Sequence, residues 1–156
     1  MTDAESITLT LTQESDYAFR VVFDETSVPD LRVDESAPIG GGTGPDPTRS
    51  LAMAIGHCLS SSLLFALRKF KNEPGTIVTR VRADMARNER GRLRVGKVAV
   101  EIQLPEAAAD YAQAQRILDQ FEDFCTVTES VRAGVPVEVN VRDASGATVH
   151  SSDRAP

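Results

Sequence analysis

The sequence is poor in residues that hold metal ions, with two cysteines and two histidines among its 156 residues. It has no Cys-x-x-Cys pair, and these four side chains lack the spacing of a zinc site. No uninterrupted apolar run reaches the ~18 residues that cross a bilayer. The first residues, Met1–Glu5, are acidic and polar, unlike a signal peptide. We therefore expect a cytoplasmic protein with no metal, no cofactor and no membrane partner.

Clustered basic charge is also missing. Lys and Arg number 17 against 23 Asp and Glu, so the net charge is −6, and the basic residues are scattered. Nucleic-acid binding usually requires a basic face, so this composition argues against a nucleic acid as a partner. A chain of this length can bury a core without disulfides, and thiols in the cytosol stay mostly reduced. We expect a single domain over residues 1–156.

The period of the hydrophobic pattern changes along the chain, which predicts an α+β fold with an antiparallel sheet. Period-two alternation predicts strands over residues 6–12, 17–23, 31–35, 77–85, 93–104 and 135–141. Helical spacing predicts helices over residues 47–72, 106–124 and 125–131. The order is βββ-α-ββ-α-α-β, and the first three strands follow so closely that we expect a meander. Residues 144–156 are polar, and we expect a loose tail there.

The two longer predicted helices differ in how their apolar residues are placed. Asp46 can cap the helix at 47–72, and Pro47 suits its first position. Apolar residues surround most of this helix, so one small domain cannot cover every side and we expect a partner subunit to help. The helix at 106–124 has a single stripe, and its predicted buried residues are Tyr111, Ala114, Leu118, Phe121 and Cys125.

The two cysteines are the candidates for chemistry. Cys58 lies about three turns into the long helix, too deep to feel the positive end of that helix strongly. Cys125 begins the short helix at 125–131. A stabilised thiolate can attack the O–O bond of a peroxide, and a second thiol can then condense with the sulfenic acid. The residues alone leave two interpretations open: a peroxidatic and resolving pair, or two small apolar side chains that fill the interior.

A thiolate at Cys58 needs help from another part of the chain, most simply from an arginine. Arg20 and Arg32 on the first strands are candidates, and Arg49 lies nine residues before Cys58 on the same helix. His57 is an unsuitable base, because adjacent residues of a helix point about 100° apart. We interpret it as an interior or interface histidine.

The surroundings of both cysteines resemble the OsmC/Ohr family of osmotically inducible and organic hydroperoxide resistance proteins. The resemblance rests on Pro38-Ile39-Gly40-Gly41, Gly44-Pro45-Asp46-Pro47, Ala54-Ile55-Gly56-His57-Cys58 and the run from Cys125 to Val131. In the family, a segment with glycine and proline opens a long central helix, and the first cysteine follows 11 residues after the proline, as Cys58 follows Pro47. The glycine run itself lacks the Gly-Lys-Ser/Thr ending of a phosphate loop, so we interpret it as a hinge that permits close approach.

The resemblance implies an OsmC-like fold, and an intertwined homodimer with the long helices in its middle. It also implies that Cys58 is the peroxidatic residue and Cys125 the resolving residue in the reduction of an organic hydroperoxide. Small dithiols or lipoylated proteins would then act as the reductant. The protein would serve in oxidative stress defence.

The sequence departs from the family at one position. Peroxidases of the family have a glutamate directly after the proline, and it orients an arginine against the peroxidatic thiolate; here that residue is Thr48. Glu35 is the candidate substitute for the acid, and either Arg20 or Arg32 the candidate arginine. This departure suggests a divergent branch. The alternatives to a peroxidase are a non-catalytic dimer that binds an apolar small molecule and a thiol redox switch.

Overall fold

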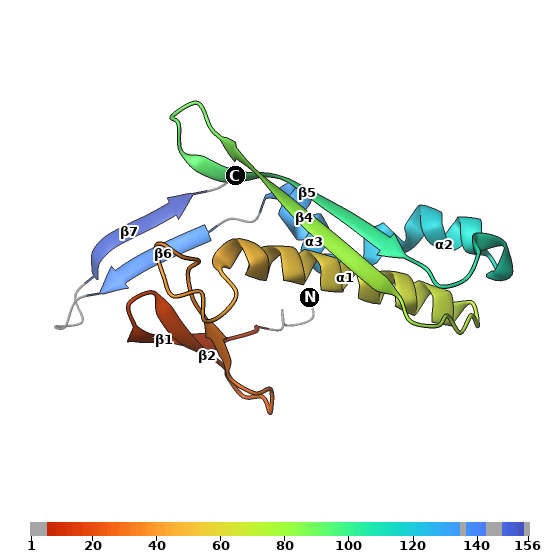
Figure 1. Ribbon diagram of the computed structural model, residues 1–156, viewed down its shortest axis with the longest axis horizontal. Coiled ribbons are helices and arrows are strands. Elements are labelled where there is room, and N and C mark those ends of the chain that lie inside the picture. The colour runs from red at the N-terminus through yellow and green to blue at the C-terminus, as the bar shows by residue number, and fades with distance from the viewer. Residues whose placement is uncertain (1–5, 135–136, 143–147, 155–156) are drawn as a thin grey trace. The chain divides into compact units, whose positions relative to one another are not determined.

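The computed structural model describes residues 6–134, 137–142 and 148–154. They form an α+β structure of helices and antiparallel strands, as the sequence predicts (Figure 1). The chain divides into two compact units. The first unit contains the residues up to Met53 together with Val81–Ala99, and the second contains Ala54–Arg80 together with the residues from Val100 onward.

Three strands of the first unit form one antiparallel sheet in the order β1-β2-β3. They are β1 (Leu9–Ser15), β2 (Ala18–Phe23) and β3 (Leu31–Val33). The β1–β2 hairpin pairs Leu11 with Val21, and β2 in turn pairs Phe19 with Val33. The predicted meander is therefore confirmed.

Strand β1 is exposed along its whole length, so the expectation of a half-buried strand is wrong. Leu11 is 52% exposed, although Val21 opposite it on β2 is 6% exposed. Alternation in the sequence predicts that a strand has an apolar face, but it does not say what covers that face. The part of the chain that the structure describes leaves the apolar face of β1 uncovered.

The glycine run at 40–44 folds back onto the end of β3, which confirms the predicted close approach. A Cβ atom at Gly40 would collide with the carbonyl oxygen of Glu35, and one at Gly44 with that of Arg32. Glycine is therefore required at both positions for steric reasons. This tight loop leads the chain into the first turn of the long helix.

The loop is held by the buried carboxylate of Asp34. Its Oδ2 accepts hydrogen bonds from the backbone N–H groups of Gly41 at 3.2 Å and Thr43 at 3.0 Å, and from the Thr43 hydroxyl at 2.8 Å. The bonds from Thr43 do most to hold the pKa of Asp34 below 3.8, although burial acts in the opposite direction. The loop conformation therefore depends on an ionised Asp34.

Helix α1 (Pro47–Lys69) begins where the sequence predicts. Oδ1 of Asp46 accepts the backbone N–H of Arg49 at 2.8 Å, which makes Asp46 the predicted cap. The helix ends three residues before the expected end at 72, where Lys71 adopts a left-handed φ of 61° and the Asn72 N–H bonds back to the last turn. The buried residues of α1 are Ile55, Gly56, Leu59, Leu63 and Leu67.

By length and composition alone, α1 could cross a membrane. Its mean hydropathy reaches 1.6 over 18 residues. The lack of an uninterrupted apolar run therefore does not by itself exclude a membrane span. The core helix of a globular protein passes the same test, and one side of α1 carries core residues of the second unit. This property of α1 is weak support for a membrane location.

Strands β4 (Val78–Arg87) and β5 (Leu93–Gln103) form a hairpin close to the predicted segments. The N–H of Asn88 bonds to the carbonyl of Arg92 at 3.0 Å and closes the turn. In the second unit, the hydroxyls of Ser60 on α1 and Thr79 on β4 lie 2.6 Å apart. This hydrogen bond fixes the beginning of β4 beside the helix.

The single helix expected over 106–124 is wrong, because the structure breaks this segment into three short helices. They are η1 (Ala108–Asp110), α2 (Ala114–Gln120) and η2 (Phe121–Phe124). Between η1 and α2, Tyr111 is extended and Gln113 has a left-handed φ of 60°. The side chain of Asn72 holds this interruption, since it accepts the N–H of Ala112 at 2.7 Å and donates to the Ala112 carbonyl at 3.0 Å.

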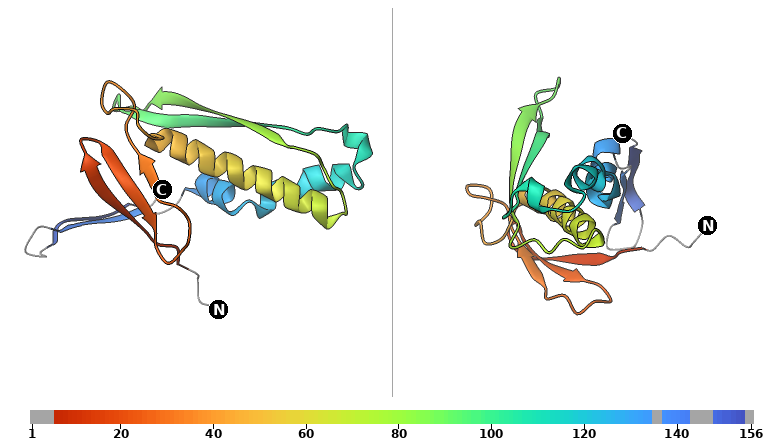
Figure 2. Two further views of the ribbon diagram at one scale, coloured as in Figure 1. Left: turned by 60° about the horizontal axis from the view of Figure 1, so that its bottom comes forward. Right: turned by 90° about the vertical axis from the view of Figure 1, so that its right-hand side faces the viewer.

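The core of the second unit lies between α1 and these short helices. Its buried members are Leu63, Leu67, Tyr111 and Ile117. Figure 2 shows α2 and the following helix, α3 (Thr126–Ala133), along the part of α1 that belongs to this unit. Leu118 is 41% exposed, so its predicted burial is wrong. The helical phase starts again at Ala114 after the break, which turns Ile117 inward instead.

The last two strands, β6 (Val137–Arg142) and β7 (Thr148–Arg154), form an antiparallel pair. Strand β6 confirms most of the strand predicted over 135–141, and Val135 lies outside the described residues. Strand β7 lies in the segment expected to be a loose tail, so that expectation is wrong for 148–154. The polar sequence of β7 gives little apolar alternation, and its pairing with β6 is what defines the strand.

Candidate functional site: a thiol pair at the start of α3

Helix α1 presents Cys58 and Ser62 on one face, because residues four apart on a helix lie one above the other. Cys58 is partly exposed, and its side chain hydrogen-bonds to that of Cys125. Ser62, one turn later, also hydrogen-bonds to the Cys125 side chain. Two consecutive turns of α1 therefore meet the same sulfur atom.

Cys125 is the residue at the N-terminal boundary of α3, and it is fully buried, with 0% of its surface exposed. Its Sγ lies 3.0 Å from Oγ1 of Thr128, to which the thiol donates a hydrogen bond. The backbone carbonyl of Cys125 accepts the N–H of Glu129 at 3.0 Å, which is the first bond of the helix. The predicted short helix at 125–131 is confirmed, with Cys125 at its boundary.

The start of α3 favours negative charge on both sulfur atoms. Backbone N–H groups of Val127 and Thr128 act to lower the pKa of the Cys58 thiol. Burial is the largest influence on this thiol, however, and together with the hydrogen bond to Cys125 it raises the pKa of Cys58 above its ordinary value. In this arrangement Cys58 is the thiol that keeps its proton.

The pKa of Cys125 is shifted the other way. Burial is again the largest single influence and acts to raise it, but the hydrogen bonds from Cys58, Thr128 and Ser62 together lower the pKa of Cys125 below its ordinary value. The first proton lost by the pair therefore leaves a negative charge that is centred on Cys125. A buried thiolate is tolerated there because several donors surround it.

Sequence reasoning missed the groups that act on the thiols. It sought an arginine to assist Cys58, whereas the structure adds the N-terminus of a second helix, α3. It gave no chemical role to Ser62 or Thr128. Two local signals could have identified these two hydroxyl residues. Ser62 follows Cys58 by four residues on one helix, and Thr128 follows Cys125 by three residues at a helix start, where the two side chains lie close together.

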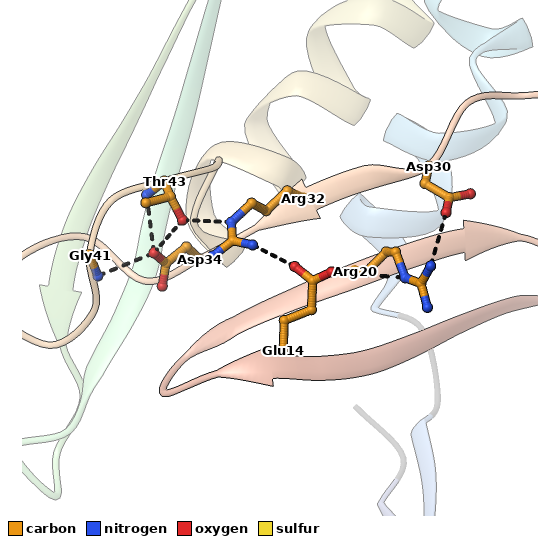
Figure 3. Close-up of polar contacts among 7 residues, drawn as sticks. All are labelled: Glu14, Arg20, Asp30, Arg32, Asp34, Gly41 and Thr43. Atoms are coloured by element: carbon orange, nitrogen blue, oxygen red, sulfur yellow. Dashed lines mark hydrogen bonds and ion pairs between the residues drawn. The ribbon is translucent and has the colours of Figure 1, made fainter.

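The two predicted arginines lie in the first unit and share one acid (Figure 3). They face each other on neighbouring strands, where Arg20 of β2 pairs with Arg32 of β3. The carboxylate of Glu14 forms ion pairs with both guanidinium groups, at an N–O distance of 2.5 Å for Arg32 and 3.9 Å for Arg20. Arg20 also lies 3.8 Å from Asp30, and Arg32 donates to the Thr43 hydroxyl at 2.9 Å. Both guanidinium groups are thus engaged by residues of the sheet and its loops.

The other residues considered for activation also belong to the first unit. Glu35 follows β3, and its backbone carbonyl accepts the N–H of Gly42 at 3.0 Å. Arg49 forms an ion pair with Asp46 and donates to the Ser36 hydroxyl at 2.9 Å. Thr48 lines an open groove of about 480 Å³ together with Asp46 and Arg49. The catalytic roles predicted for Arg20, Arg32 and Glu35 stay predictions.

An apolar pocket of about 90 Å³ lies beside the thiol pair in the second unit. Ser62 joins the two features, since it lines the pocket and also bonds to Cys125. The aromatic lining residues are Phe65, Phe70, Phe121 and Phe124. The guanidinium of Arg116 lies 5.3 Å from the centre of the Phe70 ring, which places one cation at the edge of the pocket.

Among the described residues, no group of three or more His, Cys, Asp or Glu side chains could hold a metal ion. His57 is exposed, so the interior position considered for it is wrong. It lines a second groove with Ser60 and Ser61 on another face of α1.

Solved structures of known proteins share this fold. An OsmC-like protein of unknown function from Vibrio cholerae has a TM-score of 0.67 and 14% identity, covering 81% of this chain and 94% of its own. An organic hydroperoxide resistance protein from Elizabethkingia anophelis has a TM-score of 0.62 and 18% identity, with coverage of 85% and 91%. The organic hydroperoxide resistance protein OhrB of Bacillus subtilis has a TM-score of 0.60 and 17% identity, with coverage of 82% and 91%. At these identities the likeness shows the fold alone.

Of the two comparisons by sequence, the one with family models agrees with the structural comparison. A search of curated proteins gave no significant match. The family model described as "OsmC-like protein" matches residues 40–140, which include both cysteines and all of α1. That match spans more than half of the chain. The protein therefore belongs to the OsmC-like family.

Proposed function

We propose that the protein is a thiol-dependent peroxidase that reduces organic hydroperoxides through Cys58 and Cys125. The observation that carries the proposal is the hydrogen-bonded thiol pair, in which Cys58 is partly exposed and Cys125 is buried. The exposed member can meet a peroxide from outside, and the buried member is in place to react next. Family membership and neighbours that are organic hydroperoxide resistance proteins support this reaction class.

The reaction follows from the positions of the two sulfur atoms. The Cys58 thiolate attacks the terminal oxygen of the hydroperoxide, the O–O bond breaks, and the organic oxygen leaves as an alcohol after it takes up a proton. Cys58 is now a sulfenic acid. The sulfur of Cys125 attacks it, a disulfide forms, and hydroxide leaves and is protonated to water. A dithiol or a lipoylated protein then reduces the disulfide and becomes oxidised itself.

The apolar pocket beside Ser62 supports an organic rather than an inorganic peroxide. Its phenylalanine side chains offer contacts to a hydrocarbon group, which hydrogen peroxide lacks. The raised pKa of Cys58 keeps the thiolate fraction small at neutral pH, so we expect the rate to increase as the pH rises. The backbone N–H groups of Val127 and Thr128 at the start of α3 act in the opposite direction and lower the pKa of Cys58 in part.

A coupled assay with cumene hydroperoxide and a dithiol tests the proposal. We expect turnover by the wild type, and loss of all but the background rate in Cys58→Ser. The Cys125→Ser variant is the matched control, because it keeps the first nucleophile: it should react once with peroxide and then accumulate a sulfenic acid that dimedone traps. A wild type without turnover, or a Cys58→Ser variant at the wild-type rate, contradicts the assignment.

A second candidate is a non-catalytic dimer that binds an apolar small molecule. The aromatic pocket and Thr48 in the family's glutamate position favour it. The peroxidase assay separates the two, since a protein that only binds an apolar molecule shows no hydroperoxide turnover that Cys58→Ser removes. A thiol redox switch is the third candidate, and it predicts a persistent disulfide that is reduced slowly. A cytoplasmic location and a homodimer belong to all three proposals.

A further inference from the structure

The two sulfur atoms of the thiol pair have different surroundings, and the difference bears on how a disulfide between them is reduced. We propose that the reducing dithiol attacks Sγ of Cys58, and that Sγ of Cys125 leaves as a thiolate stabilised by the Thr128 hydroxyl. Thr128 is then a positioning residue for the reductive half of the cycle. This inference rests on the proposed function, because it requires that the two thiols form a disulfide.

Access decides which sulfur atom can be attacked. A thiolate must approach a disulfide sulfur directly, so the rate depends on how open that atom is. Cys125 has no exposed surface at the start of α3, whereas Cys58 is partly exposed on α1. The reductant therefore meets Cys58 first.

The surroundings of Cys125 suit a leaving group. The better leaving thiol is the one that holds negative charge more easily, and Oγ1 of Thr128 lies 3.0 Å from its sulfur. A hydroxyl can accept from a thiol and, after rotation, donate to a thiolate. Thr128 is itself 6% exposed, so few water molecules compete for that hydrogen bond. The Ser62 hydroxyl is a second donor, and the lowered pKa of Cys125 agrees with both.

The step balances with a dithiol as the electron donor. Its first sulfur, as a thiolate, forms a bond to Sγ of Cys58 while the Cys58–Cys125 bond breaks and its electron pair stays on Cys125. The second sulfur of the dithiol then attacks the first. A cyclic disulfide is released, and the electron pair returns to Cys58, which takes up a proton. Two electrons pass from the dithiol to the protein.

The site of attack can be read directly from a trapped intermediate. The disulfide is prepared with diamide, which needs no peroxidase activity, so a failure here is distinct from failure of the proposed function. The oxidised protein is mixed with 2-mercaptoethanol, quenched with N-ethylmaleimide, and analysed by peptide mass spectrometry. We expect the mercaptoethanol adduct on Cys58 and maleimide on Cys125. The reverse pattern, or no Cys58–Cys125 disulfide after diamide, overturns the proposal.

The role of Thr128 is tested with two variants, one that keeps the shape of threonine and one that keeps its hydroxyl. Thr128→Val removes the hydroxyl, and we expect dithiothreitol to reduce its disulfide roughly tenfold more slowly than that of the wild type, because the departing thiolate loses a charge-assisted hydrogen bond. Thr128→Ser restores the hydroxyl and should restore the rate. Equal rates for Thr128→Val and the wild type overturn the proposal.

A titration distinguishes this role from a purely structural one. In a Cys58→Ser background Cys125 is the only cysteine, so the ultraviolet absorbance of a thiolate that forms below the pKa of tyrosine, about 10, reports Cys125. Adding Thr128→Val should raise the pKa of Cys125, and adding Thr128→Ser should leave it near the starting value. If Thr128→Val does not fold, Ser62→Ala tests the same principle through the other donor and should shift both the pKa and the reduction rate in the same directions. An unchanged pKa in the variant that folds contradicts the proposal.

Discussion

Asn72 shows how much one side chain decides in this protein. It is 8% exposed and bonds to the last turn of α1 and to both backbone groups of Ala112, 40 residues later. These bonds hold the chain out of helical conformation between η1 and α2. The interruption in turn sets the phase of α2 and brings Ile117 into the core.

We expect Asn72→Ala to lower the free energy of unfolding by about 1–3 kcal/mol, since it removes the hydrogen bonds that a buried amide makes to Leu67 and Ala112, each worth about 0.5–1.5 kcal/mol. Urea unfolding followed by circular dichroism measures this. Gln115→Ala is the control, because its side chain is exposed and bonds only to Asp119 on the same helix. Equal losses in the two variants would show that Asn72 does not hold the segment.

The residues of the site were only partly open to prediction from the sequence. Cys58 and Cys125 stand out because the chain has no other thiol, and their neighbourhoods resemble a known family. Thr128 and Ser62 could not be selected in the same way, since hydroxyl residues are common and have no special chemistry until a sulfur atom lies beside them. That proximity is a property of α1 and α3 together, and neither segment shows it alone.

Among the elements, α1 is the one whose beginning depends most clearly on a local signal. Asp46 accepts the N–H of Arg49 and also bonds to the Ser36 hydroxyl at 2.9 Å, so it ties the helix start to the preceding loop. We expect Asp46→Ala to lower the free energy of unfolding by about 1 kcal/mol, within the range of 0.5–2 for lost caps. Asp46→Asn keeps a cap acceptor and should lose less. The comparison fails if thermal melts place both variants at the same midpoint.

The glycine loop at 40–44 and the start of α1 should both lose stability at low pH. The pKa of Asp34 is lowered chiefly by hydrogen bonds from Thr43, and that of Asp46 chiefly by the Arg49 N–H. A carboxyl with a lowered folded pKa contributes stability that is complete above the unfolded value of 3.8 and is lost as the pH falls through the folded value. We therefore expect the urea concentration at the unfolding midpoint to decrease as the pH is lowered below 3.8.

Asp34→Asn is the matched variant for this loss of stability at low pH, because it cannot ionise. Its midpoint should be lower than that of the wild type at neutral pH and should depend less on pH in the acid range. An unchanged acid dependence in Asp34→Asn would locate the effect elsewhere. Glu89→Gln, in the exposed turn between β4 and β5, should follow the wild-type curve.

Element boundaries show where local signals end. The Asp46-Pro47 pair identifies the start of α1 because a cap and its first turn lie within a few residues. The helix expected over 106–124 was wrong because its break is held by Asn72, far away in sequence. Strand β7 was missed because its polar residues show no alternation and only the pairing with β6 reveals it.

For the whole molecule, the uncovered apolar surface is the basis of the proposed homodimer. Phe65 on α1 is 70% exposed, and Leu11 on β1 is 52% exposed. Burial of a large apolar side chain contributes roughly 1.5–3 kcal/mol, so several such residues can stabilise an interface. We expect light scattering after size exclusion to give about twice the 16.9 kDa of one chain.

Phe65→Glu should shift that mass toward the monomer, because a carboxylate in an apolar interface is costly. Arg90→Glu, which also changes charge but lies in the exposed β4–β5 turn, should leave the mass unchanged. A wild type that elutes with the mass of one chain contradicts the homodimer. A Phe65→Glu variant that stays dimeric would show that this part of α1 lies outside the interface.

The placement of its two tyrosines means that near-ultraviolet absorbance reports mainly on the second unit when the protein unfolds. The chain has no tryptophan, Tyr17 is exposed in the first unit, and Tyr111 is buried in the second unit, where its hydroxyl bonds to Glu106. Near-ultraviolet absorbance changes on unfolding will therefore come mainly from the second unit, whereas far-ultraviolet circular dichroism reports both. If the chain unfolds as the single domain expected from its length, the two signals will follow one curve in urea. Two separate curves would mean that the thiol pair sits in a unit that can lose its structure independently.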